Sequence, residues 1–105
     1  MANNNKEISD FYCTQCGKKG LPVVRSKGQS REPGHLKKMY CPYCKVQNNM
    51  AEVRPFGQYK YKDFLTEFTF GNFTSEGLRI DPSWRRFVST HEEKELIKND
   101  CVSKN

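Results

Sequence analysis

Four of the five cysteines stand in two pairs whose spacing suits metal coordination. Cys13-Thr-Gln-Cys16 and Cys41-Pro-Tyr-Cys44 are CxxC pairs separated by 24 residues, and Cys101 stands alone near the end of the sequence. The two residues inside a CxxC pair form a turn, so both thiolates approach a metal from one side. Two such turns complete a tetrahedron. We therefore predict that Cys13, Cys16, Cys41 and Cys44 bind one Zn²⁺ ion.

The predicted zinc ion is structural. A site of four thiolates is closed, whereas catalytic zinc keeps one position open for water or substrate. The chain also needs such a site, because its mean hydropathy is −0.88 and 29% of its residues are charged. A chain of 105 residues with so little apolar surface is close to the limit of folding by burial alone. We expect chelation to unfold at least the N-terminal half.

The sequence predicts an intracellular protein without a membrane partner. No apolar run approaches the roughly 20 residues that span a bilayer, and the first residues lack the basic-then-apolar layout of a secretory signal. We therefore expect a cytoplasmic location, in which cysteines stay reduced and serve as metal ligands rather than disulfides.

The elements that must position the cysteines are short strands. We expect strands at residues 11–12, 20–24, 35–40 and 50–56, with residues 1–10 as a disordered leader. Strands before each cysteine pair predict a zinc ribbon over residues 11–56, and the long gap between the pairs predicts an extended hairpin. A treble clef is the alternative if a helix follows the second pair. The β-like Met50–Val53 segment favours the ribbon.

The second half is predicted to be an aromatic-rich helical extension over residues 57–100, with a frayed tail at 101–105. Apolar residues recur at spacings of three and four within 59–70, which favours a helix, although alternation over 66–70 leaves a strand open. Asp81 and Pro82 are typical of a helix start. The whole chain is therefore predicted to be a small α+β protein, a Cys₄ zinc ribbon with a helical C-terminal extension.

The positive charge is concentrated between the cysteine pairs. Residues 17–45 hold eight basic side chains and one acidic one, a net charge of +7, whereas the formal charge of the chain is +6. A basic hairpin with interleaved tyrosines is typical of nucleic-acid binding. A solvated basic loop is the alternative. The candidate nucleic-acid-binding residues are Lys18, Lys19, Arg25, Lys27, Arg31, Lys37, Lys38, Tyr40 and Tyr43.

Aromatic residues of the second half suggest another kind of surface. They make up an unusually large share of so polar a chain, since 12% of all residues are aromatic. Most of them are expected to form a second small core that packs the extension on the ribbon. Exposed members would be anchors for a protein partner. The candidates for such anchors are Phe68, Phe70, Phe73 and Trp84.

No motif predicts an enzyme. His35 lies between the cysteine pairs, as a histidine does in some HNH-type nucleases, but that chemistry needs further ligands for a catalytic metal. His91 is the one other histidine and is distant in sequence. A nuclease therefore remains the least favoured hypothesis, Cys101 is incidental, and no small-molecule substrate is expected.

Residues 34–44, Gly-His-Leu-Lys-Lys-Met-Tyr-Cys-Pro-Tyr-Cys, followed by Glu52-Val53-Arg54, resemble a known group of proteins. The segment is similar to the GH-basic-K-x-Y/W-C-x-x-C motif of small zinc-ribbon proteins found in bacteriophages of Gram-positive hosts. The resemblance covers residues 11–56 and implies a phage-encoded protein in the cytoplasm of the infected cell. Most of these proteins lack an assigned activity. The family often has a histidine after the second pair, where Asn48 and Asn49 stand here.

These expectations combine into a function. The sequence predicts a non-enzymatic phage regulator that binds nucleic acid, or a nucleic-acid-bound host complex, through a basic hairpin. The host complex would serve transcription, nucleic-acid processing or defence. The alternative is a host-takeover protein that clamps a host protein directly, such as RNA polymerase, a nuclease or a defence factor, with its second half as the contact surface.

Overall fold

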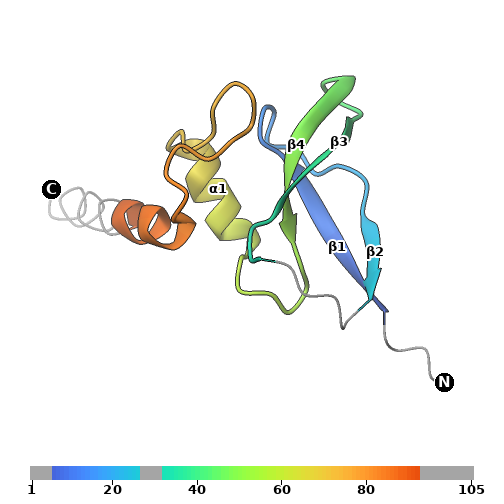
Figure 1. Ribbon diagram of the computed structural model, residues 1–105, viewed down its shortest axis with the longest axis horizontal. Coiled ribbons are helices and arrows are strands. Elements are labelled where there is room, and N and C mark those ends of the chain that lie inside the picture. Colours follow the sequence, from blue (N-terminus) through green and yellow to red (C-terminus); the bar gives the residue numbers. More distant parts are fainter. Residues whose placement is uncertain (1–5, 27–31, 93–105) are drawn as a thin grey trace, which may run out of the picture.

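An antiparallel four-stranded sheet carries the cysteine pairs in the computed structural model, which describes residues 6–26 and 32–92 (Figure 1). Its strand order is β2-β1-β4-β3. The strands are β1 (Lys6–Cys13), β2 (Val23–Ser26), β3 (Leu36–Cys41) and β4 (Val46–Val53). Helices follow the sheet in the chain, so the predicted fold class of a small α+β protein with a Cys₄ cluster is confirmed.

Strand β1 begins earlier than the sequence suggests. Its first half pairs with β2, with Lys6 opposite Ser26, and its second half pairs with β4, with Cys13 opposite Met50. The predicted disordered leader over residues 1–10 is therefore wrong for residues 6–10. Hydropathy misses this segment because backbone hydrogen bonds to β2 and β4, rather than apolar side chains, hold most of it.

The predicted basic hairpin between the cysteine pairs is also wrong. The segment between the pairs contains β2 and β3, and these strands lie at opposite edges of the sheet. Strand β3 pairs instead with β4, across the turn that holds Cys44. Residues that are close in sequence before and after position 30 are thus separated by two intervening strands.

The two faces of the sheet have different partners. On the metal face, Phe11, Cys13, Cys41 and Met50 are fully buried and form one core cluster. The opposite face, which we call the helix face, carries Tyr12, Leu36 and Ala51 against the helical half. Because successive strand residues point to opposite faces, the alternation of β1 assigns Phe11 and Tyr12 to different cores.

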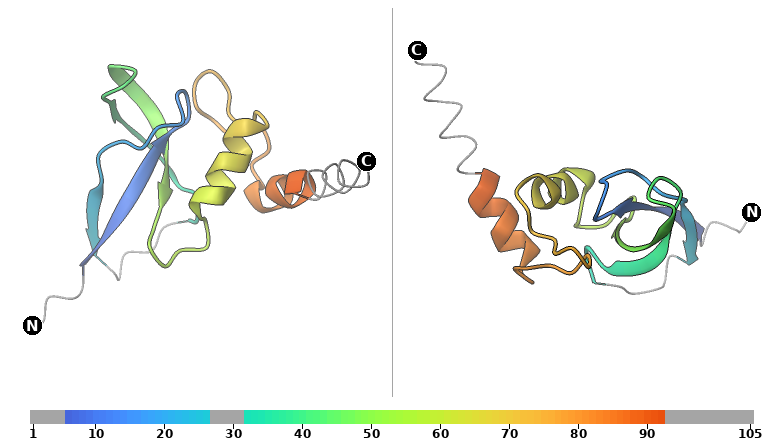
Figure 2. Two further views of the ribbon diagram at one scale, coloured as in Figure 1. Left: turned by 180° about the vertical axis from the view of Figure 1, so that it is seen from behind. Right: turned by 90° about the horizontal axis from the view of Figure 1, so that it is seen from above.

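Helix α1 (Tyr61–Thr69) and a C-terminal helix over residues 84–92 lie on the helix-face side of the sheet (Figure 2). At the start of α1 the Asp63 carboxylate accepts a 2.8 Å hydrogen bond from the Lys60 backbone N–H. Before the second helix, the Asp81 carboxylate accepts a 3.0 Å bond from the Ser83 N–H. Both predicted helices are confirmed, and the strand alternative for residues 66–70 is wrong. Within residues 6–26 and 32–92, neither helix has the length and apolar character to cross a membrane.

Aromatic rings fill the space between α1 and the sheet. Phe64 is fully buried, and its ring centroid lies 5.3 Å from that of Tyr12 and 5.8 Å from those of Phe68 and Phe73. The Trp84 ring meets Tyr59 edge-on at 4.9 Å. These offset and edge-on arrangements are favourable for aromatic pairs. The expected second small core is therefore present, and it is shared between the extension and the ribbon.

A buried polar network completes the attachment of the extension. The Glu67 carboxylate is fully buried and accepts hydrogen bonds from the Tyr59 hydroxyl at 2.6 Å and the Asn72 amide at 2.6 Å. The Arg79 guanidinium donates two more, at 2.7 and 3.0 Å. Burial and the Glu67 charge raise the pKa of Tyr59, which keeps its hydroxyl protonated as a donor. Arg79 also donates to the Gly34 carbonyl at 2.7 Å, just before β3. The network therefore joins both halves of the molecule.

Candidate metal centre

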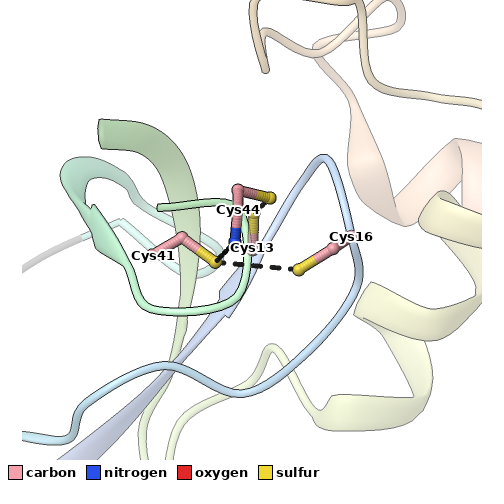
Figure 3. A group of neighbouring side chains, drawn as sticks. All are labelled: Cys13, Cys16, Cys41 and Cys44. Atoms are coloured by element: carbon pink, nitrogen blue, oxygen red, sulfur yellow. Dashed lines mark hydrogen bonds between the residues drawn. The ribbon is translucent and has the colours of Figure 1, made fainter. Parts of the chain in front are cut away.

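The four predicted ligands converge on one point between the two CxxC turns (Figure 3). All four sulfurs lie within 4.8 Å of one another. The Cys13 and Cys44 sulfurs are 3.9 Å apart, and the Cys16 and Cys41 sulfurs are 3.7 Å apart. A tetrahedron with metal–sulfur bonds of about 2.3 Å has edges of about 3.8 Å, whereas a disulfide needs about 2.05 Å. The cluster can therefore hold one metal ion, and its donor set fits Zn²⁺.

Both turns have the same backbone geometry. In the first, the Gly17 N–H donates to the Cys13 carbonyl at 2.8 Å, and in the second the Lys45 N–H donates to the Cys41 carbonyl at 2.7 Å. The donor residue has a positive φ in each case, 76° for Gly17 and 62° for Lys45. Glycine adopts this conformation freely, whereas lysine does so rarely. The two turns are therefore equivalent, and we call them knuckle 1 (residues 13–17) and knuckle 2 (residues 41–45).

Knuckle 1 rests on the helical half. A Cβ atom added at Gly17 would lie 2.8 Å from the Phe68 ring of α1, which is too close for real contacts. The Thr14 N–H and hydroxyl both bind the Asn49 carbonyl of β4, at 3.1 and 2.9 Å. The Gln15 amide reaches the Thr74 carbonyl at 3.3 Å. The position of the first cysteine pair therefore depends on the sheet and on the extension.

Three N–H groups point at the sulfurs of Cys13 and Cys41. The Gln15 and Cys44 backbone N–H groups each point at a cysteine sulfur, Cys13 and Cys41 respectively, at 3.4 Å. The Asn48 side-chain amide adds a third contact, 3.5 Å from the Cys13 sulfur. Asn48 is not among the site residues that the sequence predicts. A signal for Asn48 exists in the sequence, because it lies two positions before Met50 in the same strand. Both side chains therefore point to the metal face.

The sulfurs also act on one another's ionisation. Burial raises the pKa of Cys41, but the Cys44 and Tyr43 N–H groups and the nearby thiols outweigh it and bring the pKa to about 7. Burial and the neighbouring thiols raise the pKa of Cys44 and of Cys16. Four negative charges this close repel strongly, by about 4 kcal/mol for each pair in a partly screened site. A bound divalent cation would offset this repulsion, so four thiolates at these distances favour metal binding.

Arg25 has a structural role and is removed from the candidate nucleic-acid-binding residues. Its side chain is buried on the metal face and donates to both Glu52 carboxylate oxygens, at 3.0 and 3.2 Å. Burial alone would raise the pKa of Glu52, but the neighbouring Ser9 hydroxyl and the Arg25 charge lower it below its ordinary value. The sequence could not show this pair, because Arg25 and Glu52 lie on different strands 27 positions apart.

We expect Arg25→Ala to lower the free energy of unfolding by about 3–5 kcal/mol, because it leaves the Glu52 carboxylate buried without a counter-charge. Urea denaturation of the zinc-loaded protein measures the change. The double variant Arg25→Met/Glu52→Leu should recover most of the loss, since it removes both charges. Lys38→Ala is the matched control on an exposed strand position. A loss no larger for Arg25→Ala than for Lys38→Ala would contradict the structural role.

The remaining basic candidates differ in their surroundings. Lys19 forms an ion pair with Asp10 at 3.4 Å. Lys18, Lys37 and Lys38 are exposed, as are the rings of Tyr40 and Tyr43. Lys45 of knuckle 2, which was not among the candidates, is exposed as well. Lys27 and Arg31 lie outside the described residues, as does Cys101.

Acidic side chains are largely neutralised within the fold. Six of them in the described part of the chain form ion pairs: Glu7–Arg54, Asp10–Lys19, Glu52–Arg25, Glu67–Arg79, Asp81–Arg86 and Glu92–Lys62. Four lysines of the ribbon have no ion-pair partner among residues 6–26 and 32–92, namely Lys18, Lys37, Lys38 and Lys45. We call these four the unpaired lysines. Among the described residues of the ribbon, the lysines without an ion-pair partner are therefore side chains that face solvent.

The predicted protein-binding residues mostly serve the second core. Phe68, Phe73 and Trp84 are partly buried and pack against Tyr59 and Phe64. Phe70 is 43% exposed, and its ring lies 4.8 Å from that of His91. The remaining histidine, His35, binds through its backbone, donating to Glu32 and accepting from Glu52. Over the residues that the structure describes, the four cysteines are the one group of three or more potential metal ligands.

Comparison with protein-family models, with curated proteins and with solved structures finds no match to this chain.

Proposed function

We propose that the protein is a non-enzymatic regulator whose zinc-ribbon-like half binds nucleic acid around a structural zinc ion. Four cysteine ligands fill the coordination of Zn²⁺ and leave the metal a purely structural task. In the setting that the resemblance implies, the protein is phage-encoded and acts in the cytoplasm of the infected cell, on free nucleic acid or on nucleic acid held by a host complex.

The observation that carries this proposal is the placement of the unpaired lysines. Lys18 directly follows knuckle 1, Lys45 is the last residue of knuckle 2, and Lys37 and Lys38 lie on the neighbouring strand β3. The acidic residues that form ion pairs in the described part do so with other side chains, so each of these four lysines remains available to a phosphate. Arg25 and Lys19 are included in the charge of residues 17–45, but both form ion pairs within the fold and are less available to a phosphate.

Replacement of Lys37 and Lys38 by alanine tests the proposal. We expect Lys37→Ala/Lys38→Ala to weaken binding to a mixed-sequence oligonucleotide and to lower the slope of log K against log salt by about 1 to 2. The matched control is Lys60→Ala/Lys62→Ala, which removes the same charge from the helical half. Fluorescence anisotropy over a salt series measures both. Zinc content and melting temperature should be unchanged in the two variants.

Two results would contradict nucleic-acid binding. One is equal weakening by the control pair, which would indicate only a general charge effect. The other is capture of a host protein from lysate that survives both nuclease treatment and moderate salt. That outcome would favour the direct protein clamp.

A further inference from the structure

Two tyrosines next to the metal centre are unusually exposed. Tyr40 is 52% exposed and directly precedes Cys41, and Tyr43 is 58% exposed within knuckle 2. Neither hydroxyl has a hydrogen-bond partner among the described residues. The two aromatic rings of β1 are packed instead, Phe11 in the cluster on the metal face and Tyr12 against Phe64 in the second core. These two rings contribute little to the packed interior, so burial does not explain them.

Each exposed ring is accompanied by an unpaired lysine. The Lys18 ammonium, directly after knuckle 1, lies over the Tyr43 ring of knuckle 2, 4.7 Å from the ring centroid. Tyr40 and Lys38 are two positions apart on β3, so their side chains point to the same face of the strand. Opposite them on β4 stand Gln47 and Asn49. A flat apolar ring beside a cation is the arrangement that receives a base and its phosphate.

We propose that this surface binds single-stranded nucleic acid, with bases stacked on Tyr40 and Tyr43 and phosphates neutralised by Lys18 and Lys38. The inference rests on the proposed function and specifies its ligand. In a duplex the faces of the bases are covered by stacking, so exposed tyrosine rings have nothing to receive. In a single strand every base offers a free face. DNA and RNA share this chemistry, and the experiment compares them.

The metal centre fixes the backbone that carries both rings, although Tyr40 shares the helix face of β3 with Leu36 while Cys41 points to the metal face. Tyr43 lies inside the turn that is closed by the hydrogen bond from the Lys45 N–H to the Cys41 carbonyl. Tyr40 directly precedes Cys41 in the chain. Lys18 follows knuckle 1, whose Cys13 and Cys16 belong to the same cluster. Coordination of the four sulfurs therefore holds Lys18 and Tyr43 together, and binding should require the metal.

The test compares four labelled ligands on the zinc-loaded full chain. These are single strands of DNA and RNA of about 20 mixed nucleotides, longer than the roughly 4–16 covered by one small binding domain, and the corresponding DNA and RNA duplexes. We expect both single strands to bind at least about tenfold more tightly than the duplexes. Tyr40→Ala/Tyr43→Ala should weaken single-strand binding by at least about 30-fold, the lower limit for loss of two stacked bases, and leave duplex binding unchanged.

Two further variants test whether the loss of binding comes from the aromatic rings of Tyr40 and Tyr43 rather than from their hydroxyls or from removal of any exposed ring. Tyr40→Phe/Tyr43→Phe retains both rings and should bind single strands as tightly as the parent. Phe56→Ala is the matched control, since Phe56 is 86% exposed but lies beyond β4, away from the knuckles. Zinc content and melting temperature establish that each variant is folded.

The failures of the two proposals are distinguishable. Equal affinity for duplex and single strand, with no effect of the alanine pair, overturns the single-strand inference and leaves the proposed function intact. Absence of binding to all four ligands at low salt overturns both. A preference for one of the two single strands supports the inference and identifies DNA or RNA as the ligand.

Discussion

Removal of the metal is expected to unfold the whole described fold in one transition. Structural zinc contributes about 10–16 kcal/mol at neutral pH, which exceeds the 5–15 kcal/mol of net stability typical of a domain. Loss of the knuckles frees the ends of β1, β3 and β4, and with them the sheet. The second core loses its packing against the sheet at the same time, because Tyr12 and Ala51 of the sheet are part of this core. The helical signal should therefore disappear together with the strands.

Three measurements test this expectation. Freshly purified protein should contain one zinc per chain, and addition of a chelator should abolish the cooperative thermal transition seen by circular dichroism. Cys41→Ser should lose zinc and fail to fold, since Cys41 is a fully buried ligand at the start of knuckle 2. Cys101→Ser is the matched control and should behave as the parent. Zinc well below one per chain, or an unchanged melting temperature for Cys41→Ser, would show that the metal is not structural.

Glu67→Ala is expected to lower the free energy of unfolding by about 3–5 kcal/mol, although Glu67 lies away from the metal centre. The substitution leaves the Arg79 guanidinium without its counter-charge and removes the acceptor of the Tyr59 and Asn72 donors. Because Arg79 also binds the Gly34 carbonyl, the contact between the extension and the ribbon should loosen. A loss of this size corresponds to a lower melting temperature by roughly 12 °C or more in a domain of this length.

Urea and thermal denaturation of the zinc-loaded protein measure this loss. Lys62→Ala is the control: it removes an exposed ion pair to Glu92 at 3.9 Å and should change the free energy of unfolding by less than about 1 kcal/mol. Glu67→Met/Arg79→Met removes both charges and should be more stable than Glu67→Ala. Zinc content should remain at one per chain throughout. If Glu67→Ala and Lys62→Ala proved equally mild, the network would not hold the two halves together.

The sheet shows why charge counts along a sequence can mislead. Residues 17–45 have a net charge of +7, and the count treats every lysine and arginine alike. Arg25 is buried against Glu52 because β2 and β4 both flank β1, and Lys19 meets Asp10 at the surface. Neither carboxylate lies within the counted segment. The charge that faces solvent is therefore set by pairing between strands, which no local window contains.

Local sequence also fails to show which aromatic side chains are exposed. Phe68, Phe73 and Trp84 are candidate anchors for a partner by sequence, but in the structure they line the second core. Tyr40 and Tyr43, which flank the ligands, remain exposed. Spacing alone indicated a helix around Phe68 but not which side of it would be covered, because the covering surface comes from β1 and β4.

Sequence alone determined the four metal ligands, the small α+β class and both helices. Each of these depends on neighbours within a few positions: the turn inside a CxxC pair, the three-and-four spacing of a helix, and Asp81 with Pro82 at a helix start. Only the tertiary structure decided that β1 begins at Lys6, that β2 and β3 lie at opposite edges, and which basic side chains remain unpaired. Those properties depend on strand register and burial between distant segments, where the energy of a side chain is set by its partners in space.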